Sequence, residues 1–367
     1  MNPMDLKTLC GPDGFYPDNI WDLIVGQDPE RRRVDRAIKG IVVANSRYDA
    51  VFSLLQNTLV CAGGGRESDC FVICGPSGIG KSTVLDTFER QYGGPFKTKK
   101  GDLRPVLRVN TPPRPDLGSF YSAMLEKMGA GDLVSRNVNG MMSAVRAQLK
   151  IQQTRVLILD EFTHVVEDKT EYFTKKVVRE LKGFISERVC DVVCVGTEKM
   201  IQIPDLYEQI QRRQGEGELV LLAFDYQNDE DRQEWLDWMA DVGALLPIPP
   251  ADPLNGQRVA KQFHFASNGL PNSVMKLLLL ASLYAMEMGD DQLRQEHFWQ
   301  GFESGGSLFA RRLSDRKLDW TIRNPFDEPK TKRRRRVRVI QTDSAPDVSD
   351  ASYLSGSPSK RNVSFSK

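Results

Sequence analysis

The sequence has almost no net charge. Its 50 lysine and arginine residues face 49 aspartate and glutamate residues, so the formal net charge of the 367 residues is +1. A chain with this balance has no overall positive field. Any contact with nucleic acid must therefore come from local basic patches.

Long apolar runs are absent as well. No stretch reaches the ~18 apolar residues that a membrane-spanning helix requires, and the N-terminus carries no signal peptide. We therefore expect no membrane partner and a location in the reducing cytoplasm.

Cysteine and histidine are scarce, with six and three residues. Cys70 and Cys74 have the same spacing as Cys190 and Cys194, and both pairs lie in apolar, strand-like runs in which residues four apart share a face. No histidine lies near them in the sequence. We interpret the four as reduced core residues rather than zinc ligands.

The strongest positive signal is the stretch GPSGIGKST at residues 75–83. It follows a β-branched apolar run at 70–74, which predicts a buried strand, and precedes a predicted helix at 84–92. Strand, loop and helix agree, which favours a phosphate-binding loop over a chance glycine-rich turn. The nucleotide-binding residues that it predicts are Gly75, Pro76, Ser77, Gly78, Ile79, Gly80, Lys81, Ser82 and Thr83.

The loop backbone, Lys81 and Ser82 each have an expected role. Backbone N–H groups surround phosphate oxygens, aided by the positive end of the helix dipole. Lys81 is expected to reach the outer phosphates and Ser82 to place its hydroxyl on Mg²⁺.

A second motif follows the apolar run at 156–159. Asp160 is the candidate ligand of Mg²⁺, directly or through water, and Glu161 is the candidate general base or water-orienting residue. Thr197 ends the next predicted strand. It either orients the attacking water or caps the following helix, and both roles are compatible.

The order of predicted elements indicates an α/β fold. Strands alternating with helices predict a five-stranded parallel sheet, with ligands bound at the C-terminal strand edges. After residue 225 only helices are predicted, at 229–242, 259–266, 272–288 and 290–299. The predicted strands are 70–74, 103–110, 156–159, 189–195 and 219–222.

Composition suggests four regions. Residues 1–30 are an N-terminal arm and 31–225 the nucleotide-binding domain. Residues 226–324 form a small all-helical lid. Residues 325–367 are a disordered tail, first basic and then rich in serine and aspartate.

Five segments together carry a family resemblance: GPSGIGKST, LILDE, VVCVGT, YEQIQRR and GLPNSVMKLL. Over residues 30–300 the sequence resembles an AAA+ ATPase, and within that class the TniB/TnsC regulators of DNA transposition, with MuB as a more distant relative. The resemblance implies ATP and Mg²⁺ as cofactors and hydrolysis of ATP to ADP and phosphate.

The resemblance also assigns roles outside the loop. Arg212 or Arg213, with Arg213 favoured, would reach the γ-phosphate of a neighbouring subunit; the alternative is a solvated charge pair. Where many members carry a lid arginine near the nucleotide, this sequence has Asn272, and Lys276 is the nearest positive charge. This departure favours slow, partner-regulated turnover.

The implied partners are those of a transposition regulator. Such proteins assemble on double-stranded DNA as hexamer- or heptamer-like rings or helical filaments. They receive a signal from a TniQ-like adaptor and activate a DDE transposase, and hydrolysis resets the assembly. The alternatives are another DNA-associated AAA+ protein, such as an initiator or helicase loader, and a nucleotide-gated scaffold with no DNA role.

Contacts to DNA are expected to go to phosphates and to be nearly blind to sequence. For any single basic residue a solvated surface position is the alternative. The candidates are Lys97, Lys99, Lys100, Lys127, Arg136, Arg146, Lys175, Lys176 and Arg179.

Overall fold

The structure is a computed structural model, and the chain divides into two units, residues 1–328 and 329–367. All described residues lie in the first unit. They are 29–62, 68–99, 101–113, 116–167, 171–202, 218–305, 311–314, 317–319 and 324–326.

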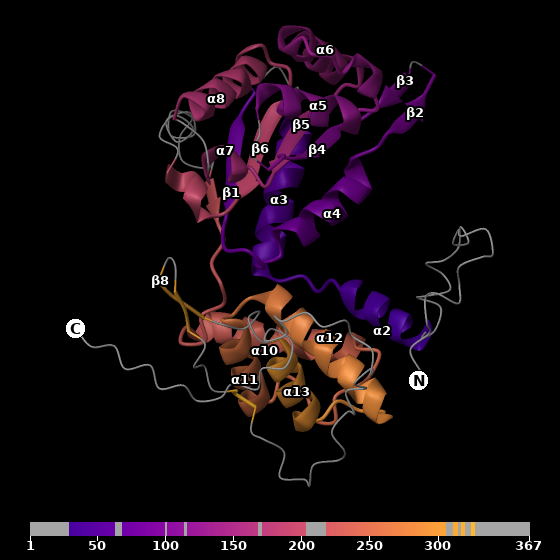
Figure 1. The fold of residues 1–367 in the computed structure, drawn as a ribbon, viewed down its shortest axis with the longest axis vertical. Helices are drawn as coiled ribbons and strands as arrows, with labels where there is room; N and C mark the ends of the chain where they lie inside the picture. Colours follow the sequence, from indigo (N-terminus) through magenta and orange to yellow (C-terminus); the bar gives the residue numbers. More distant parts are fainter. Residues whose placement is uncertain are drawn as a thin grey trace, which may run out of the picture. The chain divides into compact units, whose positions relative to one another are not determined.

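A five-stranded sheet forms the centre of the nucleotide-binding region (Figure 1), in the order β4-β5-β6-β1-β7 and with every pair parallel. The predicted five-stranded parallel sheet is therefore confirmed. The strands are β1 (Cys70–Cys74), β4 (Val106–Asn110), β5 (Val156–Asp160), β6 (Asp191–Gly196) and β7 (Glu218–Val220).

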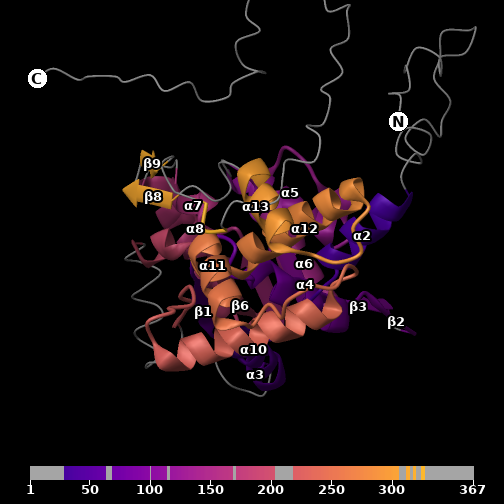
Figure 2. The same cartoon turned by 90° about the horizontal axis from the view of Figure 1, so that it is seen from below.

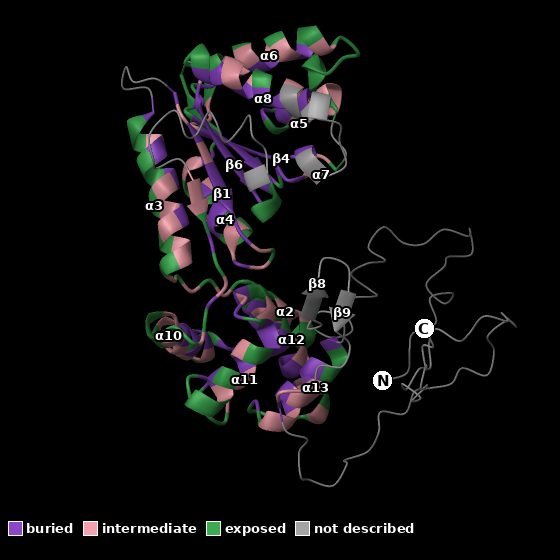
Figure 3. Cartoon of the chain, turned by 90° about the vertical axis from the view of Figure 1, so that its left-hand side faces the viewer, coloured by how far each residue is buried: buried purple, intermediate pink, exposed green. Residues whose placement is uncertain are grey.

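Helices cover both faces of the sheet (Figure 3), which explains why its strands read as continuous apolar runs. Val156 and Ile158 of β5 pack with α3 (Ser46–Cys61) and α4 (Lys81–Tyr92). The alternate residues Leu157 and Leu159 face the opposite layer. That layer consists of α5 (Leu117–Lys127), α6 (Val138–Ile151) and α8 (Glu171–Ser186).

A second group of helices follows the sheet in sequence (Figure 2), which bears out the predicted helical C-terminal region. These helices have an apolar core of their own. Trp235 and Trp238 are buried in it, and the indole N–H of Trp235 donates to Ala260 O at 3.0 Å. The helices are α10 (Asp229–Leu245), α11 (Gln257–Ser267), α12 (Pro271–Met288) and α13 (Gln295–Gly305).

Helix α2 (Pro29–Lys39) also belongs to this second core. Its buried residues Val34 and Ile38 lie in the same cluster as Trp235, and α2 packs on α12. The sequence grouped this segment with the sheet, but its apolar stripe is covered by the C-terminal helices.

Several elements differ from the prediction. The basic segment after residue 96, for which no strand was predicted, forms a hairpin of β2 (Phe96–Thr98) and β3 (Gly101–Leu103). The strand expected at 103–110 is shorter because Pro105, which has no N–H to donate, separates β3 from β4. Helix α4 begins at Lys81 rather than at residue 84.

Other elements were not predicted. They are the short helix α7 (His164–Glu167), the 3₁₀ turn η2 (Gly131–Leu133), and the hairpin β8 (Arg311–Ser314) and β9 (Lys317–Asp319). Helical structure was expected from residue 198, and the 3₁₀ turn η3 (Glu198–Gln202) lies there. The hairpin places strands in a region expected to be entirely helical.

The start of the last helix was predicted too early. A helix was expected from residue 290, but α13 begins at Gln295. Gly289 ends α12 in the left-handed conformation, and Asp290 accepts a hydrogen bond from His297 Nε2 at 3.1 Å. Asp290 therefore belongs to the connection that precedes α13.

No single helix in the described part of the chain is both long enough and apolar enough to span a membrane. Helices α11 and α12 pass that test only as a pair, and they bend by 108° at the break between them.

The burial of the cysteines gives a first test of the fold. Burial and the charges of Glu218 and Glu198 raise the pKa of Cys74 to about 11, and Cys61 is exposed. Because the thiolate is the reactive form, we expect iodoacetamide at pH 8 to label Cys61 in the native protein. Cys70, Cys74, Cys190 and Cys194 should react only after denaturation. Peptide mass spectrometry resolves the sites, and rapid native labelling of Cys74 would contradict the packing of β1.

Candidate nucleotide-binding site

The phosphate loop connects β1 to α4 and depends on its glycines. Gly78 and Gly80 have φ angles of 89° and 107°, values that glycine adopts without strain. A Cβ on Gly75 would lie 2.7 Å from Leu221 O, so the residue that follows β7 approaches too closely for a side chain there. Around Gly80 no atom lies within 4 Å of such a Cβ. The loop is packed at its start and open at its end, where α4 presents its N-terminus.

The side chain of Lys81 is held over the phosphate loop by two backbone carbonyls of that loop. Its Nζ donates to Gly75 O at 2.7 Å and to Pro76 O at 3.0 Å. Burial lowers the pKa of Lys81, while the charges of Glu161, Glu198 and Asp160 act in the opposite direction. The ammonium group has lost part of its hydration, so an anionic ligand bound beside it would stabilise its charge.

Asp160 and Glu161 follow at the end of β5 with contrasting environments. Asp160 is 4% exposed, and its Oδ1 accepts the backbone N–H of Glu161 at 2.9 Å. Its Oδ2 accepts two bonds from Arg108, a residue that the sequence analysis did not single out. Glu161 is exposed and has a φ of 52°, a costly conformation for a non-glycine residue and one that is concentrated at functional sites.

Thr197, at the end of β6, is tied to a residue that sequence reasoning missed. Thr163 Oγ1 accepts the backbone N–H of Thr197 at 2.7 Å, and the two hydroxyls lie 3.2 Å apart. Thr163 is buried, two residues after Glu161. The turn after β5 and the end of β6 are thereby joined, which places the Thr197 hydroxyl near the Glu161 turn.

A cavity of about 270 Å³ lies beside the phosphate loop and touches Gly80, Lys81 and Thr83. Asn272 and Lys276, four residues apart on α12, both line it, and the backbone N–H of Asn272 donates to Gly78 O at 3.1 Å. Its walls are mostly apolar. They include Ile41, Val42, Val43, Trp238, Met275 and Leu279.

Arg47 joins the start of α3 to α10 at the same cavity. Its guanidinium donates to Asp231 at 2.7 and 2.8 Å and to Glu234 at 2.7 Å, and it lies 4.0 Å from the ring centroid of Phe224. Burial alone would raise the pKa of Asp231, but the bonds from Arg47 prevail and lower it. Arg47 also lines the cavity, so the nucleotide-binding region and the helical region share this ion-pair cluster.

The remaining predicted residues are not gathered at this site. Arg212 and Arg213 lie outside the described residues, as does Lys100, and the side chain of Lys175 is not described. Lys127 pairs with Glu89 at 2.7 Å, and Arg146 pairs with Glu180 and Glu187. The exposed candidates are Lys97, Lys99, Arg136 and Arg179, and Lys176 is half-buried.

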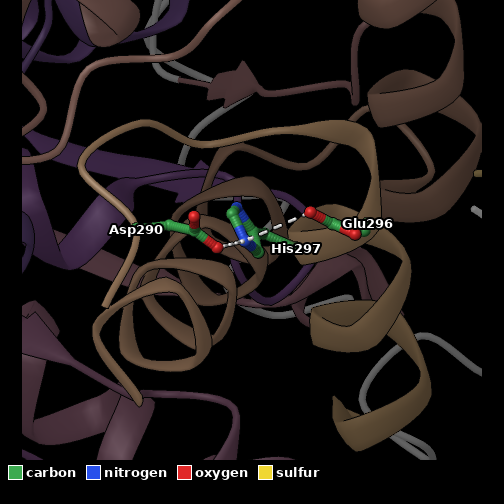
Figure 4. Close-up of side chains that lie close together, drawn as sticks. All are labelled: Asp290, Glu296 and His297. Carbon is green, nitrogen blue, oxygen red and sulfur yellow. Dashed lines mark hydrogen bonds and ion pairs between the residues drawn. The ribbon is translucent and has the colours of Figure 1, made fainter. Parts of the chain in front are cut away.

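A second polar cluster lies between α12 and α13, formed by Asp290, Glu296 and His297 (Figure 4). His297 Nδ1 accepts the backbone N–H of Arg294 at 3.0 Å, so Nε2 carries the proton and donates to Asp290. A metal ligand needs a free ring lone pair, and this tautomer offers none. The cluster fixes the start of α13 and does not suit a cation.

Sheet order, phosphate loop and helical region together define an AAA+ ATPase fold. The structure is similar to ORC2 of Aeropyrum pernix, in ADPNP–ADP complexes, with 17% identity and a TM-score of 0.54 over 73% of this chain and 71% of that chain. It is also similar to A. pernix ORC1 in complex with DNA, with 17% identity and a TM-score of 0.53 over 75% of this chain and 70% of that chain. Cdc6p from Pyrobaculum aerophilum is a further match, with 12% identity and a TM-score of 0.50 over 81% of this chain and 70% of that chain.

The sequence identifies the family more narrowly. The model for the bacterial TniB protein matches residues 33–220, more than half of the chain. The chain therefore belongs to the TniB family, and the predicted resemblance is confirmed. No curated protein matches the sequence.

The Thr163–Thr197 contact predicts a specific loss of stability. Thr163→Val removes the acceptor of the Thr197 N–H and should lower the free energy of unfolding by about 1–3 kcal/mol. Thr163→Ser keeps the hydroxyl and should lose less than half as much. Urea denaturation of the three proteins measures the difference. Equal stability of the valine and serine variants would show that the hydroxyl is not the relevant group.

Proposed function

We propose that this protein is an ATP-dependent regulator of DNA transposition. It assembles on target DNA, links a TniQ-like adaptor to a DDE transposase, and is reset by hydrolysis of ATP to ADP and phosphate. The observation that carries this proposal is the convergence of Lys81, Asp160, Glu161 and Thr197 on one sheet edge in a TniB-family chain.

The nucleotide fits the residues around the loop. The glycine-built loop and the N-terminus of α4 bind phosphates, with Lys81 as the charged contact. The neighbouring apolar cavity receives the base. Lys276 lines that cavity and is the positive charge that α12 offers in place of a lid arginine. An ammonium makes a weaker, less directed phosphate contact than a guanidinium does, which supports slow turnover.

Magnesium would be held by the Ser82 hydroxyl and the Asp160 carboxylate, oxygen donors of the kind that Mg²⁺ prefers. When bound, the cation neutralises charge on the phosphate oxygens. Glu161 then accepts a proton from the attacking water, and the Thr197 hydroxyl orients that water. Arg212 or Arg213 of an adjacent protomer would supply further positive charge at the γ-phosphate.

Contact with DNA is proposed at the β2–β3 hairpin. Lys97 and Lys99 are exposed there beside the exposed ring of Phe96, and neither forms an ion pair within the described part of the chain. Lys127 and Arg146 are already paired with carboxylates, which makes them weaker candidates. Lys100, Arg136, Lys175, Lys176 and Arg179 remain further proposed contacts.

We propose that the chain divides into an arm (1–30), a nucleotide-binding domain (31–225), a helical lid (226–324) and a tail (325–367). The separate apolar cores of the sheet and of the helices support it. Under this division α2 is the segment of the nucleotide-binding domain that docks on the lid.

Assembly should depend on the bound nucleotide. With ATP and a DNA duplex we expect Glu161→Gln to form persistent oligomers, because binding is retained while the water-activating carboxylate is lost. Lys81→Ala should bind little ATP and remain dispersed. Electron microscopy measures assembly on DNA, a fluorescent ATP analogue measures nucleotide binding, and phosphate release measures hydrolysis. A Lys81→Ala protein that covers DNA as the parent does would overturn the proposal, as would DNA affinity that ATP does not raise.

The hairpin lysines should control the salt dependence of DNA binding. Replacing Lys97 and Lys99 with alanine should reduce the slope of log affinity against log salt by about 0.9 for each lost phosphate contact. Lys127→Ala is the matched control, because its ammonium is paired with Glu89. Filter binding from low to moderate salt measures all three proteins. If Lys127→Ala changes the slope more than the hairpin variant does, the proposed surface is wrong.

A further inference from the structure

Arg108 is a charged residue buried beside apolar side chains of the sheet. It lies on β4, is 8% exposed, and shares its face of the sheet with Val106, Ile158 and Val193. Charged side chains are rarely buried to this extent unless they are paired. A partner for Arg108 is therefore required.

The guanidinium of Arg108 joins two parts of the candidate nucleotide site. Nη2 and Nε donate to Asp160 Oδ2 at 2.6 and 3.2 Å. Nη1 pairs with Asp86 and, at 3.5 Å, with Glu89. Asp86 and Glu89 lie four and seven residues after Ser82, on the same side of α4. Arg108 thus connects the helix that begins with the phosphate loop to the carboxylate at the end of β5.

These contacts limit what Asp160 can offer a cation. Each carboxylate oxygen accepts about two bonds. Oδ2 receives both of its bonds from Arg108, whereas Oδ1 receives one from the Glu161 amide. Only Oδ1 keeps a free lone pair, and the nearest nitrogen of the charged guanidinium lies 2.6 Å from the other oxygen.

We infer that Arg108 is a positioning residue for the magnesium site, an inference that rests on the proposed function. It fixes the plane of the Asp160 carboxylate, restricts it to one oxygen, and offsets its charge. Mg²⁺ therefore binds weakly to the protein alone, and the phosphates of ATP supply most of its affinity. The metal arrives and leaves with the nucleotide.

Magnesium titration separates this role from a purely structural one. The readout is binding of a fluorescent ATP analogue at increasing Mg²⁺, in a Glu161→Gln background that prevents hydrolysis. Arg108→Met removes the opposing charge and should lower the half-saturating Mg²⁺ concentration about tenfold, since charges this close interact strongly at low dielectric. Arg108→Lys keeps the charge and should stay within about twofold of the parent.

Two further variants complete the design. Asp86→Asn removes the shorter of the two contacts to α4 and leaves the Asp160 contact, so the half-saturating Mg²⁺ concentration should not move. With Glu161 present, Arg108→Lys should reduce hydrolysis about tenfold, because a single ammonium cannot hold a carboxylate at two points. In an Asp160→Asn background, Arg108→Met should no longer lower the half-saturating Mg²⁺ concentration, because the carboxylate through which it acts is gone.

Folding is checked by circular dichroism and melting temperature. If Arg108→Met does not fold, Arg108→Met with Asp86→Asn restores part of the charge balance and takes its place. A folded variant with the parent's magnesium dependence, or Arg108→Lys at the parent's hydrolysis rate, would overturn the inference. A parent protein that neither binds nor hydrolyses ATP would refute the proposed function instead.

Discussion

At Gly196, the last residue of β6, the phosphate loop and the turns after β5 and β6 contact one another. Gly196 O accepts the backbone N–H of Gly75 at 3.3 Å, while its Cα faces Thr163 and Met200 so closely that a Cβ would overlap them. Strand β6 lies between β1 and β5. Sheet pairing and one side-chain-free position therefore set the spacing between the phosphate loop, the Glu161 turn and Thr197.

The two cations at this edge of the sheet are held in opposite ways. Burial dominates for Lys81 and lowers its pKa, because its direct partners are neutral carbonyls. For Arg108, burial also acts to lower the pKa, but bonds to Asp86 and Asp160 raise it overall. Arg108 is thus the resident counter-ion of Asp160. Lys81 keeps its charge available for a ligand. A lysine in place of Arg108 would hold Asp160 less firmly, because an ammonium lacks the planar fork of a guanidinium.

Local patterns were enough to predict the buried strands, the phosphate loop and the Asp160–Glu161 pair, because each is specified by adjacent residues. Thr163 bonds to Thr197 and Arg108 to Asp160, which lie 34 and 52 residues further along the chain. Only the pairing of the strands brings these residues into contact. One signal was present: Arg108 interrupts the apolar run of β4. The β2–β3 hairpin and the late start of α13 were missed because polar composition does not distinguish a turn from a short strand or a capped connection.

The cavity beside the loop links ligand binding to the position of the helical region. Its lining combines Lys81 and Thr83 of α4 with Asn272 and Lys276 of α12, and Arg47 lines it while holding α10 through Asp231. A ligand that fills this cavity contacts both regions at once. Its binding energy therefore depends on their relative placement, and by reciprocity it biases that placement. The Asn272–Gly78 bond, the Arg47 cluster and the bond from Trp238 Nε1 to Val43 O at 3.3 Å already join the two regions, so a ligand in this cavity adds to contacts that exist without it.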